Sequence, residues 1–516
     1  MPLGLELDPS AAEAVFTRAT SPAEYGTGTE LYRTARRGRI VAMAVSPARA
    51  AAFEILLKVK RENSYASELL HTSRFAKLSS ADHGLATELV MGVLRWQSGL
   101  DRTLADASSQ KLEKLDYEVL VALRLGIYQL QFLSRVPARA AIFESVELVK
   151  TARKKSAAVF VNAVLRKVTG VLAKSASRSP AKAHPADLFA AIRNSADPIA
   201  LGQEASHPEW LVKRWIEDYG LEAARQICIH DQSLPATAIH IYDNQSLDEL
   251  AQAGIELAAG HFLSSARTVV SGDVTRTPAC LAGRIAIQDE ASQLVAFLVG
   301  HGESILDCCA APGGKTLLLA RRNPNSTVVA AELHPHRARL LRKLARAPNI
   351  RVIGADARQL PFTKTFDRIL VDVPCSGTGT LARNPEIKWR LRFEDLGDLQ
   401  SRQIAILKSA LGQLAPGGRL VYSTCSLERE ENEAVVEAVL AGAHGFSVVD
   451  CREELEHLRQ AGDLCATDIE SLLSGPYLRT IPGRYPCDGF FAAIIQPRKL
   501  ARGEKATFQS GLHLRE

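Results

Sequence analysis

Two cysteines, fifty residues apart, each follow a hydrophobic segment of the chain. Cys375 stands in Asp372-Val-Pro-Cys-Ser-Gly-Thr-Gly and Cys425 in Tyr422-Ser-Thr-Cys-Ser. Both hydrophobic segments have the composition of strands, so each cysteine is expected at a strand end. A cysteine in such a place is more often a small buried residue than a nucleophile. The two surrounding motifs reverse that preference, and the pairing suggests covalent chemistry on a pyrimidine base.

A glycine-rich loop lies upstream of both cysteines, between an apolar segment and a helical one. It reads Leu306-Asp-Cys-Cys-Ala-Ala-Pro-Gly-Gly-Lys-Thr316. Gly313 and Gly314 permit backbone conformations that a Cβ would block, and the start of the next helix offers unpaired N–H groups to a polar ligand. The spacing matches neither a phosphate-binding P-loop nor a dinucleotide fingerprint. We therefore expect a small zwitterionic or nucleotide ligand at this loop.

Two acids stand near the ends of the next two strand candidates, 327–333 and 350–356. They are Glu332 and Asp356. Strands and helices alternate here at short intervals, which is typical of an open α/β sheet, and such sheets bind ligands at the carboxyl ends of their strands. Glu332 is placed to bind ribose hydroxyls. Alternatively, both acids cap the turns that follow them, and Lys315 is an exposed first-turn residue without a role.

These segments, together with 383–389 and 488–491, resemble bacterial 16S rRNA cytosine-C5 methyltransferases of the Sun family, the type with an N-terminal NusB-like domain. The resemblance covers roughly residues 45–497. It implies S-adenosyl-L-methionine as methyl donor, Cys425 as nucleophile, Cys375 as the thiol that assists product release, and Asp372 as a hydrogen-bond partner of the protonated ring. The cofactor-binding residues expected from the loop and the resemblance are Cys309, Ala310, Ala311, Pro312, Gly313, Gly314, Lys315, Glu332, Asp356 and Asp372.

The substrate expected from this chemistry is an accessible base in RNA. Neighbouring strand ends bring the two thiols within roughly 10 Å of one base. The base must be flipped out or single-stranded, because its reacting carbons are unreachable in a stacked helix. The NusB-like domain favours 16S rRNA. The alternatives are the same chemistry on tRNA, a non-catalytic RNA-binding scaffold, and methylation of an amine in DNA or protein, which Asp372-Val-Pro-Cys disfavours because base-nitrogen enzymes carry a different motif there.

Composition predicts a cytoplasmic enzyme of two or three domains. The chain has 516 residues, of which 46% are hydrophobic, and no apolar run approaches membrane-spanning length. Its nine cysteines suggest reduced thiols rather than a disulfide framework. There is no zinc-ligand spacing. We expect a monomer that binds RNA, without a metal and without a membrane.

The expected fold is α/β: a Rossmann-like class I methyltransferase domain with a seven-stranded, mostly parallel sheet, preceded by an all-α domain and a small RRM-like α+β subdomain. Helical spacing of apolar residues supports the all-α assignment, and the other two follow from the resemblance. The domains are 1–42, a disordered basic extension or mis-called start; 45–170, NusB-like; 171–205, linker; 206–281, RRM-like; 282–497, catalytic, with its last strand near 490–496; and 498–516, a polar tail without an assigned role.

Two basic segments are candidates for contact with RNA. Between Arg135 and Lys182 there are eleven Lys or Arg residues and only two acids, which suits phosphate contacts or, equally, a solvated helix face. Trp389 stands among Lys388, Arg390 and Arg392. That charged company favours an RNA-facing surface, and the alternative is a core aromatic residue.

Overall fold

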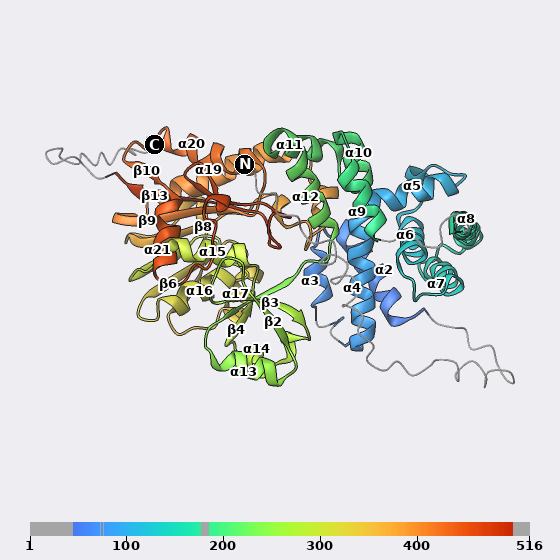
Figure 1. Cartoon of the computed structure of the whole chain (residues 1–516), viewed down its shortest axis with the longest axis horizontal. Coiled ribbons are helices and arrows are strands. Elements are labelled where there is room, and N and C mark those ends of the chain that lie inside the picture. The colour runs from blue at the N-terminus through green and yellow to red at the C-terminus, as the bar shows by residue number, and fades with distance from the viewer. Residues whose placement is uncertain (1–44, 73, 76, 177–184, 499–516) are drawn as a thin grey trace, which may run out of the picture. The chain divides into compact units, whose positions relative to one another are not determined.

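The computed structural model describes residues 45–72, 74–75, 77–176 and 185–498, which form two compact units (Figure 1). The helical unit comprises the described residues up to 236 together with 377–393 and 481–487. The catalytic unit comprises 237–376, 394–480 and the described residues from 488. Our expectations for residues 1–42 and for the tail beyond residue 498 lie outside the described residues.

The helical unit is built around α6, a helix that is apolar on almost every side. Val121, Leu123, Leu125 and Ile127 of α6 are all buried, so this helix forms the centre of the core. The all-α domain predicted from apolar spacing is therefore present. Its helices are α2 (Pro47–Arg61), α3 (Ala66–Leu70), α4 (Ser80–Arg95), α5 (Gln97–Ala107), α6 (Tyr117–Phe132), α7 (Ala138–Thr151) and α8 (Ala158–Ala176).

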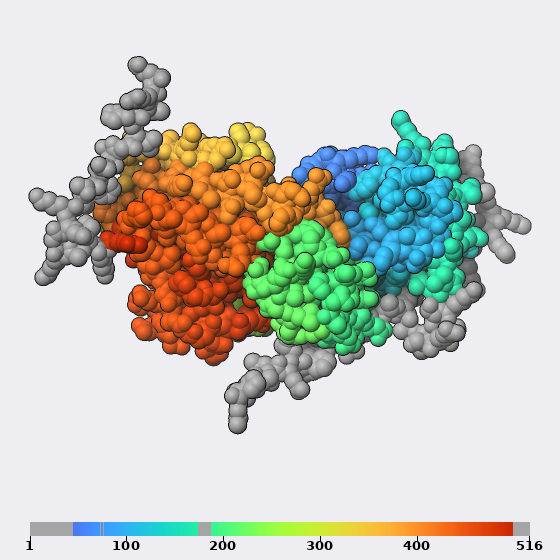
Figure 2. Space-filling model, turned by 90° about the horizontal axis from the view of Figure 1, so that it is seen from above, coloured from blue at the N-terminus to red at the C-terminus, as the bar shows by residue number. Residues whose placement is uncertain are grey.

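Four more helices extend this unit through the segment expected to be a linker and into the start of the segment expected to be RRM-like. They are α9 (Pro185–Asn194), α10 (Pro198–Glu204), α11 (Glu209–Tyr219) and α12 (Leu221–Gln232). Pro185 and Pro198 occupy helix starts, where a missing N–H costs nothing, and Asp197 caps α10 by accepting from the N–H groups of Ile199 and Ala200. The Gln232 side chain donates to the Arg95 carbonyl at 3.0 Å. These helices, green in Figure 2, lie against the blue-to-cyan helices of the same unit.

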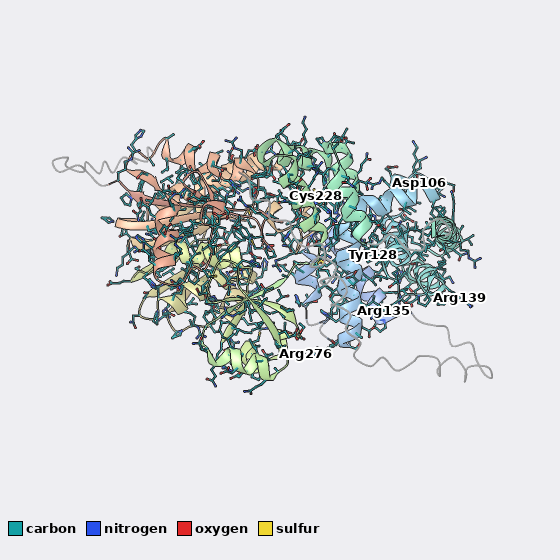
Figure 3. All side chains as sticks on the ribbon, viewed as in Figure 1. Asp106, Tyr128, Arg135, Arg139, Cys228 and Arg276 are labelled. Carbon is teal, nitrogen blue, oxygen red and sulfur yellow. The ribbon has the colours of Figure 1, made fainter. Side chains whose placement is uncertain are left out.

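In contrast to our expectation that no apolar run approaches membrane-spanning length, one helical segment among the described residues, Lys155–Ala173, is by length and composition alone able to cross a membrane. A single such segment is weak evidence, because the core helix of a soluble protein passes the same test. Val161 and Leu165 in this segment are buried against the other helices. Nearby, Arg135 and Arg139 are exposed at the surface of the helical unit (Figure 3), and phosphate contact by this basic surface stays a prediction.

The catalytic unit begins with a small antiparallel sheet of order β2-β3-β1-β4. Its chain order, βαββαβ, is that of RRM-like folds. Ile239, Leu250 and Ile285 form its core. The subdomain spans 237–287 rather than 206–281, because α11 and α12 belong to the helical unit. Its elements are β1 (Thr237–Ile241), α13 (Gln245–Gln252), β2 (Glu256–Ala259), β3 (Ala266–Ser271), α14 (Pro278–Leu281) and β4 (Ile285–Ile287).

The main sheet has nine strands in the order β11-β12-β13-β9-β8-β5-β6-β7, with β10 paired to β13. Strands β7, β6, β5, β8 and β9 are parallel, and β13 runs antiparallel beside β9. The seven expected strands are present, and the β11–β12 hairpin adds two. The strands are β5 (Ser304–Asp307), β6 (Thr327–Glu332), β7 (Ile350–Gly354), β8 (Phe366–Asp372), β9 (Leu414–Thr424), β10 (Phe446–Val449), β11 (Leu473–Ser474), β12 (Tyr477–Thr480) and β13 (Phe490–Pro497).

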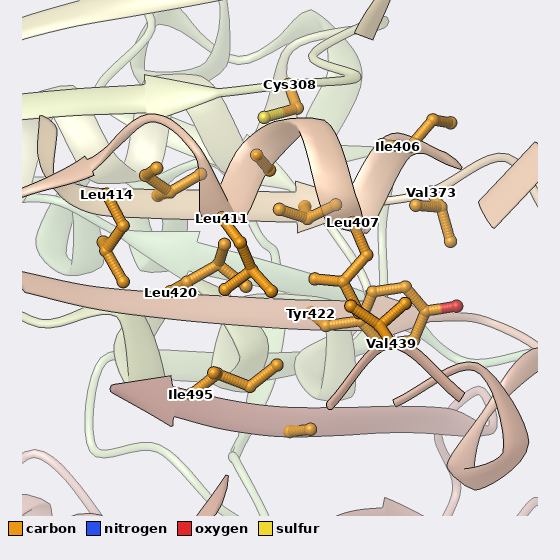
Figure 4. Packing of buried hydrophobic residues seen from close by; sticks show 14 of the residues in the cluster. Cys308, Val373, Ile406, Leu407, Leu411, Leu414, Leu420, Tyr422, Val439 and Ile495 are labelled. Atoms are coloured by element: carbon orange, nitrogen blue, oxygen red, sulfur yellow. The ribbon is translucent and has the colours of Figure 1, made fainter. Parts of the chain in front are cut away.

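Helices cover this sheet and fix its central strands. Leu407 and Leu411 of α19 pack against Leu420 and Tyr422 of β9 (Figure 4). Cys308 is 1% exposed in the same cluster, as expected for a packing residue. The helices of the unit are α15 (Glu290–Val299), α16 (Gly314–Arg322), α17 (Pro335–Leu344), α19 (Asp395–Leu411), α20 (Glu433–Leu440) and α21 (Cys451–Gln460).

The segment around Trp389 belongs to the helical unit and is not the RNA-facing surface we expected. Lys388, in α18 (Ile387–Arg390), is 1% exposed. The Trp389 indole N–H donates to the Leu94 carbonyl at 2.6 Å, and Arg390 donates to the Val59 carbonyl at 2.6 Å. The polar ends of these side chains thus satisfy backbone carbonyls of α2 and α4. The charged residues next to Trp389 suggested an exposed surface, but Lys388 and Arg390 pack within the unit.

Burial of the Lys388 ammonium gives a testable pH dependence. Its Nζ has no hydrogen-bond partner among the described residues, and burial, opposed by the charge of Asp231, lowers the pKa of Lys388 to about 7. A lysine pKa that is lower in the folded state means that the unfolded chain binds more protons, so stability rises with pH above 7. We predict that the free energy of unfolding of the wild type rises on the order of 4 kcal/mol between pH 7 and 10, and that Lys388→Met lacks this rise.

The measurement is urea unfolding of both proteins across that pH range. The predicted result is a wild-type free energy of unfolding that climbs relative to that of Lys388→Met. Parallel curves would show that Lys388 stays charged in the folded state.

Candidate active site

Two neighbouring parallel strands bring the cysteines together. Asp372 at the end of β8 pairs in register with Ser423 near the end of β9. Because both chains leave the sheet at the same edge, the turns that follow them meet there. The two Sγ atoms of Cys375 and Cys425 lie 3.3 Å apart, in direct contact, where the sequence had predicted only a separation within about two strand spacings.

The surroundings of Cys375 favour the protonated form of its thiol. The hydrogen bond with Cys425 and burial raise the pKa of Cys375 well above its ordinary value, and the charges of Glu431 and Asp372 act in the same direction. Cys375 therefore keeps its proton at neutral pH. Both cysteines are partly buried, so each retains a route to a bound molecule.

A partly buried ion pair connects the glycine-rich loop with the strands that carry the cysteines. Lys315 donates to Asp372 Oδ2 at 2.9 Å, and the Ser423 hydroxyl donates to Asp372 Oδ1 at 2.8 Å. Burial works to lower the pKa of Lys315, but the charge and hydrogen bond of Asp372 outweigh it and raise the pKa, with a smaller contribution from Cys425. Lys315 is consequently not an exposed first-turn residue. It lies between the loop, the carboxylate and the thiol pair.

The loop itself is the sharp turn that its glycines predicted. Gly313 has a φ of +115°, and a Cβ there would lie 2.7 Å from the Leu341 side chain, so only glycine fits. The Ala310 N–H donates to the Ala331 carbonyl at 3.0 Å, which holds the loop against β6. Residues 309–312 form the turn between β5 and α16, with a cis peptide before Pro312.

The two acids stand at the predicted strand ends, and both cap turns. Glu332 accepts from the His334 N–H at 2.9 Å, and Asp356 accepts from the Arg358 N–H at 2.9 Å. Asp356 also pairs with the Arg358 guanidinium at 2.6 Å. The capping alternative is thus satisfied for both residues. Glu332 is 4% exposed at the end of a central strand, and its contact with a ligand stays a prediction.

Asp307, at the end of β5, is a site residue that our reading of the sequence did not single out. Its Oδ2 accepts from the Thr316 hydroxyl at 2.7 Å, whereas its Oδ1 has no hydrogen-bond partner among the described residues. Burial raises the pKa of Asp307 to about 7, against the opposing effects of Thr316 and Lys315. An acid that ends an apolar strand directly before a glycine-rich loop was the available signal.

Glu431 is the second residue that was missed. It is fully buried and accepts hydrogen bonds from Ser376 and Ser426, which directly follow the two cysteines. Nothing in the local pattern Arg-Glu-Glu-Asn distinguishes this glutamate from its neighbours. Its contacts depend on the fold of three separate segments.

The open α/β sheet, the glycine-rich turn beside acidic strand ends and the thiol pair define an S-adenosylmethionine-dependent methyltransferase. The family model described as 16S rRNA methyltransferase RsmB/F matches residues 296–496, and the NusB family model matches residues 46–170. The chain belongs to the RsmB/F family of rRNA methyltransferases, which its relatives show over most of its length.

The relatives are similar over most of the chain. The chain is 36% identical over 463 residues to the probable ribosomal RNA small subunit methyltransferase B of Bacillus subtilis, covering 87% of this chain and 98% of that protein. It is 31% identical over 469 residues to the protein of the same description from Synechocystis, covering 87% and 99%. The crystal structure of PH0851 shares the fold, with a TM-score of 0.69 and 21% identity over 87% of this chain and 98% of that one.

The described loop residues fit the cofactor of this family, S-adenosylmethionine. Asp307 Oδ1, a buried acceptor without a partner beside the Gly313 turn, matches a ligand that carries an ammonium group. The N–H groups at the start of α16 suit a carboxylate. Residues 309–315, Glu332 and Asp356 remain predicted contacts.

Asp307 supplies a second pH test, of opposite sign to that of Lys388. A carboxyl pKa raised to about 7 means that the folded state binds more protons than the unfolded chain above pH 4, so the wild type loses stability as pH rises to 7. Asp307→Asn retains an acceptor for the Thr316 hydroxyl and has no charge to bury. We predict that the free energy of unfolding of Asp307→Asn, relative to that of the wild type, increases by up to about 4 kcal/mol as pH rises from 4 to 7.

Urea unfolding without cofactor measures this difference. Asp398→Asn, at an exposed position of α19, is the matched control and is expected to follow the wild type. A constant difference between Asp307→Asn and the wild type across the range would mean that Asp307 is ionised in the folded protein.

Proposed function

We propose that the protein methylates C5 of a cytosine in 16S rRNA, with Cys425 as the nucleophile. The observation that carries the proposal is the contact between two thiols, 3.3 Å apart, beside the carboxylate of Asp372. Family membership supplies the methyl donor and an rRNA substrate. The thiol pair supports carbon methylation, because C5 of cytosine becomes nucleophilic only after another atom adds to the ring.

The proposed reaction uses one thiol to activate the ring. Cys425 Sγ adds to C6, which forms an S–C6 bond and makes C5 enamine-like. When bound, S-adenosylmethionine would supply an electrophilic methyl group to C5, with its S–CH3 bond breaking to leave S-adenosylhomocysteine. The C5 proton then leaves to a base, the S–C6 bond breaks, and the electrons of the C5–H bond restore the C5–C6 double bond while the thiolate departs.

The neighbouring residues support this division of roles. The raised pKa of Cys375 keeps that sulfur protonated, which suits it to the role of the group that assists elimination. Asp372, fixed by Lys315 and Ser423, is suited to accept a hydrogen bond from the protonated cytosine ring.

RNA recognition is proposed for the accessory parts of the chain. The exposed basic residues that include Arg139 suit contacts with phosphate, and the NusB-type domain and the RRM-like subdomain are both RNA-compatible folds. The names of the relatives from Bacillus subtilis and Synechocystis favour small-subunit rRNA over tRNA. A ribosomal substrate would place the reaction in the bacterial cytoplasm.

The first test is methyl transfer from labelled S-adenosylmethionine to purified 16S rRNA and, in parallel, to tRNA. We predict 5-methylcytosine, identified by the mass of the nucleoside, in 16S rRNA alone. Cys425→Ala should lower the rate at least about a thousandfold, because the covalent route is lost. Cys465→Ala, which removes an exposed thiol, should retain full activity. Equal product from Cys425→Ala would refute the nucleophile assignment. Labelled tRNA would show that the substrate includes tRNA and would refute the preference for 16S rRNA alone.

The second test concerns the role of Cys375. If its thiol assists elimination, Cys375→Ala should accumulate a protein–RNA adduct that survives denaturation, whereas Cys425→Ala should form none. Denaturing gels of each protein with RNA and the methyl donor measure this directly. Normal turnover by Cys375→Ala without any adduct would assign that thiol to packing.

A further inference from the structure

A single buried carboxylate joins the two cysteine-bearing turns. Glu431 ends the short helix η6 (Arg429–Glu431) that precedes α20. Its Oε1 accepts from the Ser376 N–H at 2.8 Å, and its Oε2 accepts from the Ser426 hydroxyl at 2.6 Å and from the Ser376 hydroxyl. The two hydroxyls are themselves 3.0 Å apart. Since Ser376 follows Cys375 and Ser426 follows Cys425, the carboxylate connects the residues next to both thiols.

A fourth donor extends this connection to the other side of Cys375. Gln403 of α19 donates through Nε2 both to Glu431 Oε1, at 2.8 Å, and to the carbonyl of Pro374, at 3.0 Å. The residues immediately before and after Cys375 are therefore both held through Glu431 or its partner. The position of Cys375 relative to Cys425 depends on this small network.

Glu431 is itself firmly placed. The Tyr422 hydroxyl donates to the Glu431 carbonyl at 2.6 Å, and the Asn432 side chain donates to the Ser426 carbonyl at 2.9 Å. The strand, the turn after it and the start of α20 are thus connected at one point. Because the backbone of Glu431 is held in place, its carboxylate can fix the positions of the groups that donate to it.

Burying the Glu431 carboxylate costs more free energy than burying an apolar side chain that only fills space. Glu431 is 0% exposed, and its four hydrogen-bond donors are uncharged groups. Burying a carboxylate without a cation requires that every lone pair be satisfied, and an apolar side chain of similar size would avoid that requirement. The arrangement makes sense where a fixed acceptor is needed between two turns.

We propose that Glu431 is a positioning residue that sets the separation and orientation of the Cys375 and Cys425 thiols. The inference rests on the proposed function for its catalytic consequence, although the thiol geometry itself is independent of any substrate. The carboxylate also places a negative charge near Cys375, which supports the protonated state of that thiol.

The test reads the thiol pair directly, in the full-length protein without RNA or methyl donor. Dibromobimane becomes fluorescent when both of its arms have alkylated thiols, and peptide mass mapping identifies the Cys375–Cys425 product. Glu431→Gln replaces one acceptor oxygen by an amide that faces donors. We expect cross-linking to slow at least about tenfold, whereas Glu437→Gln, the same change on the exposed side of α20, should match the wild type.

Kinetics then separate positioning from a general loss of structure. Glu431→Gln should lower kcat for methyl transfer at least about tenfold and leave the KM for S-adenosylmethionine within about twofold, and the melting temperature monitors folding. If Glu431→Gln fails to fold, the Ser376→Ala, Ser426→Ala double variant replaces it, because it keeps the carboxylate and removes both hydroxyl donors. Slower cross-linking by that variant supports the proposal, and wild-type cross-linking overturns it.

The outcomes also separate this inference from the proposed function. Slower cross-linking in a protein that makes no 5-methylcytosine would support the positioning role and reject the reaction. Normal cross-linking and normal kcat in Glu431→Gln, with 5-methylcytosine formed, would reject the positioning role alone.

Discussion

The parallel pairing of β8 with β9 is the constraint on which the rest of the site depends. Asp372 and Ser423 are direct partners in that register, and the turns that carry Cys375 and Cys425 leave the sheet side by side. A shift of one residue in a strand turns every side chain to the opposite face. Such a shift would break the Ser423–Asp372 hydrogen bond and separate the thiols, so the packing of α19 on β9 supports the chemistry as well as the fold.

Three buried or partly buried carboxyl groups lie in the site, and each finds different hydrogen-bond or ionic partners. Asp372 has a cation, Lys315. Glu431 has four neutral donors instead. Asp307 has an unpartnered Oδ1 among the described residues, and burial raises its pKa. Each arrangement suits a different proposed task. Asp372 is a fixed charge for the substrate, Glu431 is a fixed acceptor between two turns, and Asp307 keeps one acceptor oxygen free for a ligand.

The sequence predicted the architecture and the local motifs better than it predicted contacts at a distance. Motifs of fixed spacing located the loop at Gly313 and both cysteines, because their requirements are local. Glu431 was missed because its partners come from three segments far apart in the chain. Lys388 was misread because a lysine beside a tryptophan has the same local pattern whether it faces solvent or a helix core. Residues 185–204 were expected to belong to a linker but form α9 and α10, a distinction that depends on tertiary packing.

The most direct test of the central claim is to identify which sulfur bonds to the base. RNA that contains 5-fluorocytidine at the target position cannot lose a proton from C5, so the adduct is trapped after methyl transfer. Digestion and mass spectrometry then locate the modified cysteine. The account predicts that the nucleotide is attached to the peptide that contains Cys425. Attachment to the Cys375 peptide, or methyl transfer to this RNA without any adduct, would contradict it.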